Sequence, residues 1–178
     1  KVYKDAPKTK KGYARLTAGS AHEVFEDCVD DIDGAVRYAR AHGAKEVYLA
    51  GHSTGCQKSI YWAYKRKSAG VNGIILLAPI SDYAGMRMEV GDKAISKALS
   101  VAQKLVAEKK KHQLLPTHIW PSMLDAQRFI SLYSKKGNEE TFPYWDEARV
   151  PKALRSVKVP VFVVLAEQDE YADRSAEV

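Results

Sequence analysis

Apolar residues recur at helical spacing between residues 20 and 43. Ser20 followed by Glu23 is a capping-box pattern, which predicts a helix that begins at Ser20 and ends at Gly43. The apolar positions of this helix are Phe25, Cys28, Val29, Ile32, Val36 and Ala39. Such a stripe must be buried, and we expect it to lie on a sheet. Residues 1–19 show no period and are expected to form a loop.

Apolar runs at 46–50, 71–78 and 159–166 are typical of strands. In the second run Ile74 to Leu77 are apolar at consecutive positions, which indicates a strand covered on both faces, as in parallel sheets. We expect the third run to be buried as well. A helix is predicted from Thr54 to Lys67. This alternation predicts an α/β fold with a mostly parallel sheet, flanked by helices and joined by crossover connections.

The segment between the second and third strands is too long for a simple crossover. It contains a helical pattern near 92–111 and another at 122–134. We therefore predict a helical cap insertion at approximately 83–150 within a single domain that spans 1–178. A cap over the strand ends would shape a substrate pocket.

The first strand runs directly into Gly-His-Ser-Thr-Gly at 51–55, and a helical pattern follows. G-x-S-x-G between a strand and a helix is typical of a nucleophile elbow, in which small residues on either side of the serine let strand and helix approach closely. Ser53 is therefore the candidate nucleophile. The backbone N–H of Thr54 would face a developing oxyanion, with the helix N-terminus behind it.

A serine hydroxyl needs a base, and the base needs a carboxylate that orients it. Asp169 follows the third strand at its C-terminal end, the sheet edge on which the elbow opens, and is the preferred acid. Asp82, after the second strand, is the competing acid.

The base is not evident, because no histidine follows Asp169. His52 adjoins the serine and should point away from it, and His22 and His42 lie near the ends of the first predicted helix. His112 and His118 lie in or beside the predicted cap and could swing in.

The strands that usually precede the first helix of a hydrolase, with the second oxyanion donor, are also absent from the pattern. We expect the chain to be an internal segment of a longer α/β hydrolase, lacking its N-terminal strands and its histidine-bearing C-terminal segment.

Composition narrows the function only slightly. The net charge of +6 comes mostly from lysines, but no nucleic-acid module and no membrane span is recognisable. Two cysteines, Cys28 and Cys56, fall on apolar-facing helical positions, which favours reduced core thiols and a cytoplasmic setting. We expect no nucleic-acid or membrane partner, no cofactor and no metal. The oligomeric state stays open.

Four strings carry a family resemblance: Gly51-His-Ser-Thr-Gly-Cys-Gln57, Gly73-Ile-Ile-Leu-Leu-Ala-Pro-Ile-Ser-Asp82, Arg128-Phe-Ile-Ser-Leu132 and Asp169-Glu170-Tyr171. Together they resemble the uncharacterised-domain family of α/β hydrolases that includes the fungal siderophore (fusarinine-type) esterases, over about residues 12–172.

The resemblance implies a serine hydrolase with Ser53 as nucleophile, the Thr54 N–H in the oxyanion hole and Asp169 as triad acid, acting on esters of medium-sized polar molecules. The sequence departs from the family pattern at Glu167, where a glycine is expected, and at Lys58, where an acidic residue is expected. The family's histidine would lie beyond Val178.

The leading hypothesis is a cytoplasmic serine hydrolase that cleaves carboxylic esters of a small or medium-sized substrate through an acyl-enzyme intermediate. An amidase, thioesterase or peptidase would use the same parts. The alternative from another class is a non-catalytic binding or scaffold protein on an α/β-hydrolase fold. A weaker third reading is an anion-binding module that uses the lysine-rich surface.

Overall fold

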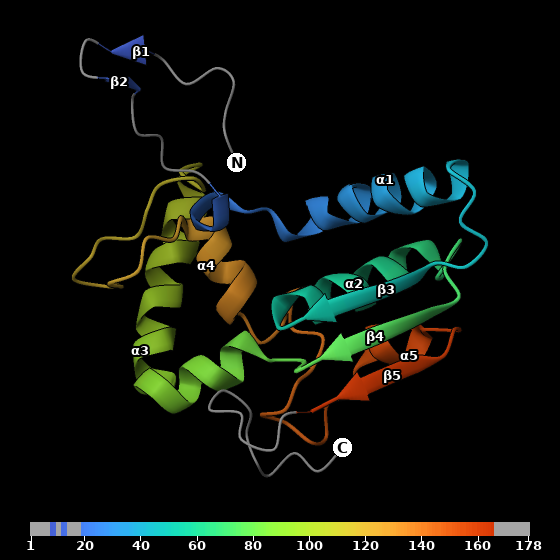
Figure 1. The fold of residues 1–178 in the computed structure, drawn as a ribbon. Coiled ribbons are helices and arrows are strands. Elements are labelled where there is room, and N and C mark those ends of the chain that lie inside the picture. Colours follow the sequence, from blue (N-terminus) through green and yellow to red (C-terminus); the bar gives the residue numbers. More distant parts are fainter. Residues whose placement is uncertain (1–7, 10–11, 14–18, 166–178) are drawn as a thin grey trace.

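A computed structural model describes residues 8–9, 12–13 and 19–165 of the chain. Figure 1 shows the order of its elements. They are β1 (Lys8–Thr9), β2 (Gly12–Tyr13), the 3-10 turns η1 (Gly19–His22) and η2 (Phe25–Asp27), α1 (Cys28–Ala41), β3 (Tyr48–His52), α2 (Thr54–Arg66), β4 (Gly73–Leu77), α3 (Asp82–Ala107), α4 (Ala126–Tyr133), α5 (Lys152–Ser156) and β5 (Val161–Val164).

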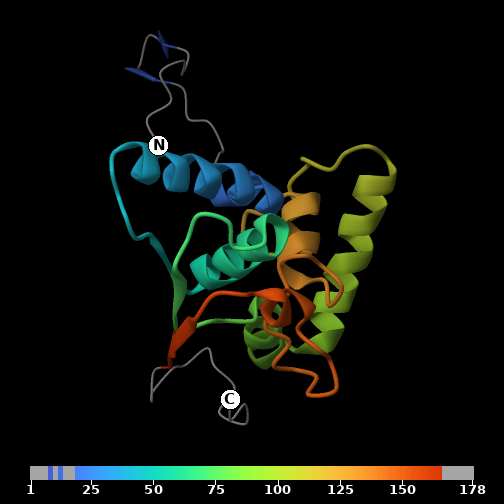
Figure 2. The ribbon, with the colours of Figure 1, turned by 90° about the vertical axis from the view of Figure 1, so that its right-hand side faces the viewer.

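The central feature is a parallel sheet in the order β3-β4-β5. In its register Gly51 lies opposite Leu76 and His52 opposite Leu77, so β3 and β4 end at the same edge. Helices α2 and α5 lie on one face of this sheet (Figure 2). The predicted α/β class, a parallel sheet flanked by helices, is confirmed. The antiparallel pair β1–β2 was not predicted.

The opposite face of the sheet carries exposed apolar side chains. Leu77 lies opposite His52 and Val164 opposite Leu77, so their side chains share this face with Phe162. Phe162 is 64% exposed, and Leu77 and Val164 are exposed too. The expectation that the strand at 159–166 is buried was therefore wrong, because nothing in the described part of the chain covers this side of β5.

The first helix begins later than predicted. α1 starts at Cys28, after η1 and η2, and makes no capping-box bond from Ser20. Glu23 does not act as the second residue of a capping box. Its carboxylate pairs with Lys58 and Arg128 and does not accept from a backbone N–H of the described residues. α1 packs chiefly against α2, so the expectation that its stripe lies on the sheet was also wrong.

The segment after β4 builds a second apolar cluster. α3 bends at Gly91, whose φ of 80° and ψ of 157° are not helical; glycine reaches this conformation without a side-chain clash. α3 packs against α4, and their cluster contains Ile95, Trp120 and Phe129. The role of 83–150 as a cap stays a prediction. None of the helices in the described part of the chain is long and apolar enough to cross a membrane.

Candidate active site

Ser53 lies at the sharp turn between β3 and α2. Its φ is 52° and its ψ is −124°, a conformation that side-chain-bearing residues rarely adopt and that costs about 1–3 kcal/mol. Two features hold it there: the Ser53 N–H donates to Leu77 O across the sheet at 3.1 Å, and α2 begins at the next residue. The turn therefore presents a half-buried serine at the C-terminal edge of the sheet, as an elbow requires.

The two glycines of the motif differ in what they do. A Cβ at Gly51 would meet the backbone of the following helix, with the Gly55 carbonyl carbon at 2.5 Å and the Cys56 nitrogen at 2.6 Å. A Cβ at Gly55 would meet no heavy atom within 4 Å among the described residues. The predicted close approach of strand and helix thus requires a glycine at position 51. The described residues do not require one at position 55.

Cys56 fills the corner beneath the serine. Its Sγ lies 3.1 Å from Gly51 O and 3.3 Å from Leu77 O, and the side chain is fully buried. Burial raises the pKa of the Cys56 thiol, and burial likewise raises the pKa of Cys28 to about 12. Both are free, buried thiols, as expected. A buried thiol with a raised pKa is poorly reactive, so Cys56 packs the turn beneath Ser53.

Gln57 joins the first turn of α2 to the start of α3. Its Nε2 donates to Asp82 Oδ2 at 2.8 Å, and the Gln57 side chain is buried. Burial raises the pKa of Asp82, and the hydrogen bond from Gln57 opposes this. Asp82 therefore lies at the same sheet edge as Ser53, already engaged by an amide. Asp169, the preferred acid, lies outside the described residues.

Ser81 and Glu140 extend this polar layer. Ser81 caps α3 by accepting from Ala84 N at 3.0 Å, and its hydroxyl donates to Glu140 Oε1 at 2.8 Å. Trp145 Nε1 donates to the same oxygen at 3.2 Å. Burial raises the pKa of Glu140 to about 7, and Oε2 has no hydrogen-bond partner among the described residues. Sequence reasoning missed Glu140, whose only signal was its place in a polar tract.

A buried ionic network lies behind these groups. Arg128 is 4% exposed; it bonds Glu139 Oε2 at 2.6 Å and Glu23 Oε2 at 3.1 Å. Lys58 pairs with the other oxygen of Glu23. Burial raises the pKa of Glu139, and Arg128 opposes this rise. Lys58 stands where the family pattern has an acidic residue. Its positive charge is paired with the Glu23 carboxylate.

None of the five histidines is hydrogen-bonded to Ser53 in the described part of the chain. His22 and His112 both contact Asp125, at 2.8 and 2.9 Å, and His42 stacks on Tyr38. His52 and His118 are exposed. The base is thus not assembled with the serine by these residues.

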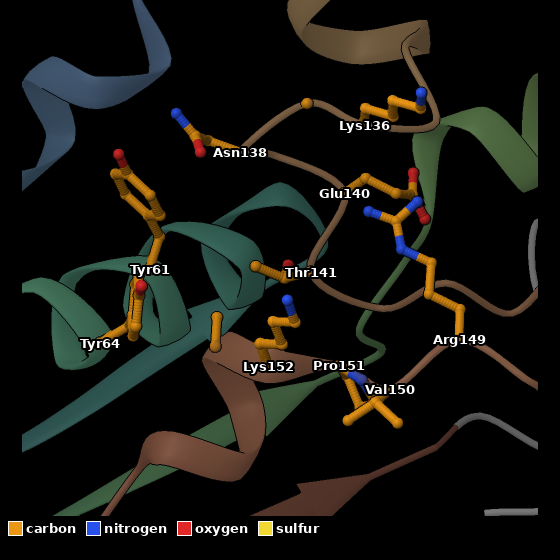
Figure 3. A pocket seen from close by; sticks show the side chains of 12 residues that line it. Tyr61, Tyr64, Lys136, Asn138, Glu140, Thr141, Arg149, Val150, Pro151 and Lys152 are labelled. Carbon is orange, nitrogen blue, oxygen red and sulfur yellow. The ribbon is translucent and has the colours of Figure 1, made fainter.

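A pocket of about 390 Å³ lies on the α2–α5 side (Figure 3). Lys136, Arg149 and Lys152 give it a basic lining, and Glu140 reaches it from the polar layer. No residue of the 51–55 turn lines it. The pocket is therefore separate from the candidate nucleophile.

The comparisons place the chain in a family. The model described as "Protein of unknown function (DUF1749)" matches residues 8–178. The chain belongs to this family. The prediction that the chain belongs to an uncharacterised-domain family is thus confirmed. The likeness to siderophore esterases stays a prediction.

No curated protein matches the DUF1749 chain. A solved structure that is similar is the Vlm2 thioesterase domain with genetically encoded 2,3-diaminopropionic acid, bound with a dodecadepsipeptide. The identity is 15% and the TM-score 0.31, over 88% of this chain and 71% of that one.

Proposed function

We propose that this DUF1749 protein is a serine hydrolase that cleaves a carboxylic ester of a small or medium-sized molecule, with Ser53 as nucleophile. The single observation that carries the proposal is the backbone of Ser53, at φ 52° and ψ −124° between a parallel strand and a helix. A strained non-glycine residue at such a junction points to a functional demand, because a solvated turn serine has no need of it.

The turn supplies two of the parts that acyl transfer needs. The Ser53 hydroxyl would attack the ester carbonyl, and the Thr54 N–H, at the first position of α2, would donate to the oxyanion. An N–H at this position has no acceptor within its own helix, and the helix dipole favours negative charge there. The acyl-enzyme formed in this way would then be hydrolysed by water.

The polar layer supports the positioning of this turn. The Gln57–Asp82 bond ties α2 to the start of α3, and the Ser81–Glu140 bond ties that start to the loop behind it. Neighbours that are held in this way do not need to reorganise during the reaction. For the triad we keep Asp169 as the proposed acid, orienting a histidine base.

The test is labelling of the whole protein with a fluorophosphonate probe, read by intact mass. Ser53→Ala is the variant, and Ser100→Ala is the control because Ser100 is an exposed helical serine that bonds only Ser96 O among the described residues. We expect one adduct on the wild type and on Ser100→Ala, and none on Ser53→Ala. Circular dichroism on all three checks that they are folded.

Absence of an adduct on the folded wild type would refute the hydrolase and favour the non-catalytic binding protein. If the adduct forms, the next measurement compares the rates at which the protein hydrolyses an ester, a thioester and an anilide of the same acyl group. The fastest of the three shows whether the protein is an esterase, a thioesterase or an amidase. We expect turnover to be fastest on the ester.

A further inference from the structure

Three metal-ligating side chains converge far from Ser53 in the sequence and outside its polar layer. They are His22 in η1, His112 in the connection after α3, and Asp125, the N-cap of α4. His22 Nδ1 lies 2.8 Å and His112 Nδ1 2.9 Å from the same atom, Asp125 Oδ2. The candidate ligand atoms all lie within 4.8 Å of one another.

The carboxylate at the centre is held before any ion arrives. Asp125 is fully buried, and its other oxygen, Oδ1, accepts from Arg128 N at 2.7 Å. That bond fixes the rotamer of Asp125 and leaves Oδ2 for the two imidazoles. Fixed first ligands reduce the ordering cost of binding an ion.

The backbones that bear the ligands are joined independently of the rings. Asp125 N donates to Ala21 O at 2.9 Å, beside His22. Ala126 N donates to Gln113 O at 3.0 Å, beside His112. The three segments are therefore adjacent even when the side chains make no contact.

We propose that His22 Nδ1, His112 Nδ1 and Asp125 Oδ2 bind one Zn²⁺ ion, with a water in the fourth position. Two imidazole nitrogens and one carboxylate oxygen form a ligand set of the kind that zinc accepts, at bond lengths of about 2.0–2.2 Å. Ligands at those lengths around a tetrahedral ion lie about 3.3 Å apart, so small side-chain rotations from the present contacts suffice.

The site is open on one side. The His112 side chain is 54% exposed and that of His22 27% exposed, so an ion can enter from solvent and keep a water. The exposed lysines at 109–111 place positive charge close in sequence to His112, and this charge repels a cation. Salt screens the repulsion because the lysines are exposed to solvent. The ion would join η1 to the start of α4 and to the connection before it. This proposal is independent of the serine chemistry and revises the expectation that the protein has no metal.

The experiment uses the whole chain without a histidine tag, stripped with a chelator and titrated with Zn²⁺ by calorimetry, with bound metal counted by mass spectrometry. His112→Ala and Asp125→Asn are the variants; the asparagine can still cap α4 through its carbonyl oxygen. His118→Ala is the matched control, an exposed histidine in the same connection. Melting curves with and without Zn²⁺ give a readout independent of any activity.

We expect one Zn²⁺ per chain and a raised Tm in the wild type and in His118→Ala. In His112→Ala and Asp125→Asn the affinity should fall by at least ~100-fold, since even loss of an outer-shell partner costs 10–100-fold. Equal binding in His112→Ala and the wild type, or no binding by the wild type, would overturn the proposal and leave Asp125 Oδ2 as the acceptor of two hydrogen bonds from the imidazoles. His112 is exposed, so its variant decides the question even where Asp125→Asn does not fold.

Discussion

Gly51→Ala should damage the protein far more than Gly55→Ala, although both add one methyl group to the same motif. The Gly51 Cβ would meet three backbone atoms, among them the Gly55 carbonyl carbon at 2.5 Å and the Cys56 nitrogen at 2.6 Å. Real Cβ atoms essentially never come within 3.0 Å of a heavy atom outside their own residue and its chain neighbours, and backbone atoms cannot rotate away. The start of α2 must then move away from β3.

The magnitude follows from the packing. Overpacking a core by a methylene costs typically about 1–3 kcal/mol, where side chains can give way. Here the obstacle is backbone, so we expect the free energy of unfolding to fall by at least about 3 kcal/mol. Gly55 lies in α2, and no heavy atom of the described residues lies within 4 Å of its Cβ position, so Gly55→Ala should be neutral or stabilise by up to about 1 kcal/mol.

The assay is urea unfolding of both variants beside the wild type, followed by tryptophan fluorescence. Fluorophosphonate labelling of the same samples tests whether Ser53 is still presented. A Gly51→Ala protein with wild-type stability and labelling would show that strand and helix are not in close contact at this point, and the geometric account of the motif would fail.

Three further predictions test the buried polar groups. The pKa of Glu140 is raised to about 7 from an ordinary 4.5, so the native state keeps a proton that the unfolded chain loses and stability falls as pH rises from 4.5 to 7. Glu140→Gln should therefore be more stable than the wild type by up to about 3 kcal/mol at about pH 8, with the difference vanishing near pH 4.5, in urea titrations at both pH values; a pH-independent difference would contradict this. Arg128→Met leaves Glu139 buried without its cation and should cost about 3–5 kcal/mol by the same titrations, and adding Glu139→Gln should restore part of it; a larger loss in the double variant would contradict the pairing. Cys28 and Cys56 are buried and have raised pKa values, so a thiol-specific aromatic disulfide reagent should modify neither cysteine in the native protein. It should modify both after unfolding in guanidinium. Rapid labelling of the native protein would argue against the burial of these thiols.

The elbow was predictable because its signals are local. A strand run, a small-residue turn and a helical pattern follow one another within the residues 46–67. The spacing restricts which backbone can connect them, so the place of Ser53 in the turn between strand and helix could be predicted from the sequence. The catalytic roles of Ser53 and of the Thr54 N–H stay predictions. The second half of α3 was predictable for the same reason, since its apolar stripe has the helical period. The first half, before the bend at Gly91, was not predicted.

The start of α1 could not be predicted locally, because remote groups compete for the capping residues. Ala21 O accepts from Asp125 N, and the Glu23 carboxylate pairs with Lys58 and Arg128. A capping-box pattern has no information on such partners. The prediction that β5 is buried was wrong for a related reason. Hydrophobicity shows that a strand can be covered, but only the tertiary packing shows which of its faces is covered.

What the chain determined by itself is the order of α1, β3, α2, β4, α3, α4 and β5 and the strained serine between β3 and α2, since these depend on neighbours along the backbone. Only the tertiary structure decided the contacts that surround the serine and the histidine cluster. Gln57 meets Asp82 across 25 positions, Ser81 meets Glu140 across 59, and His22 meets Asp125 across 103. Such pairs form because packing brings buried polar groups together where each must find a partner, and no periodicity in the sequence specifies which partner that is.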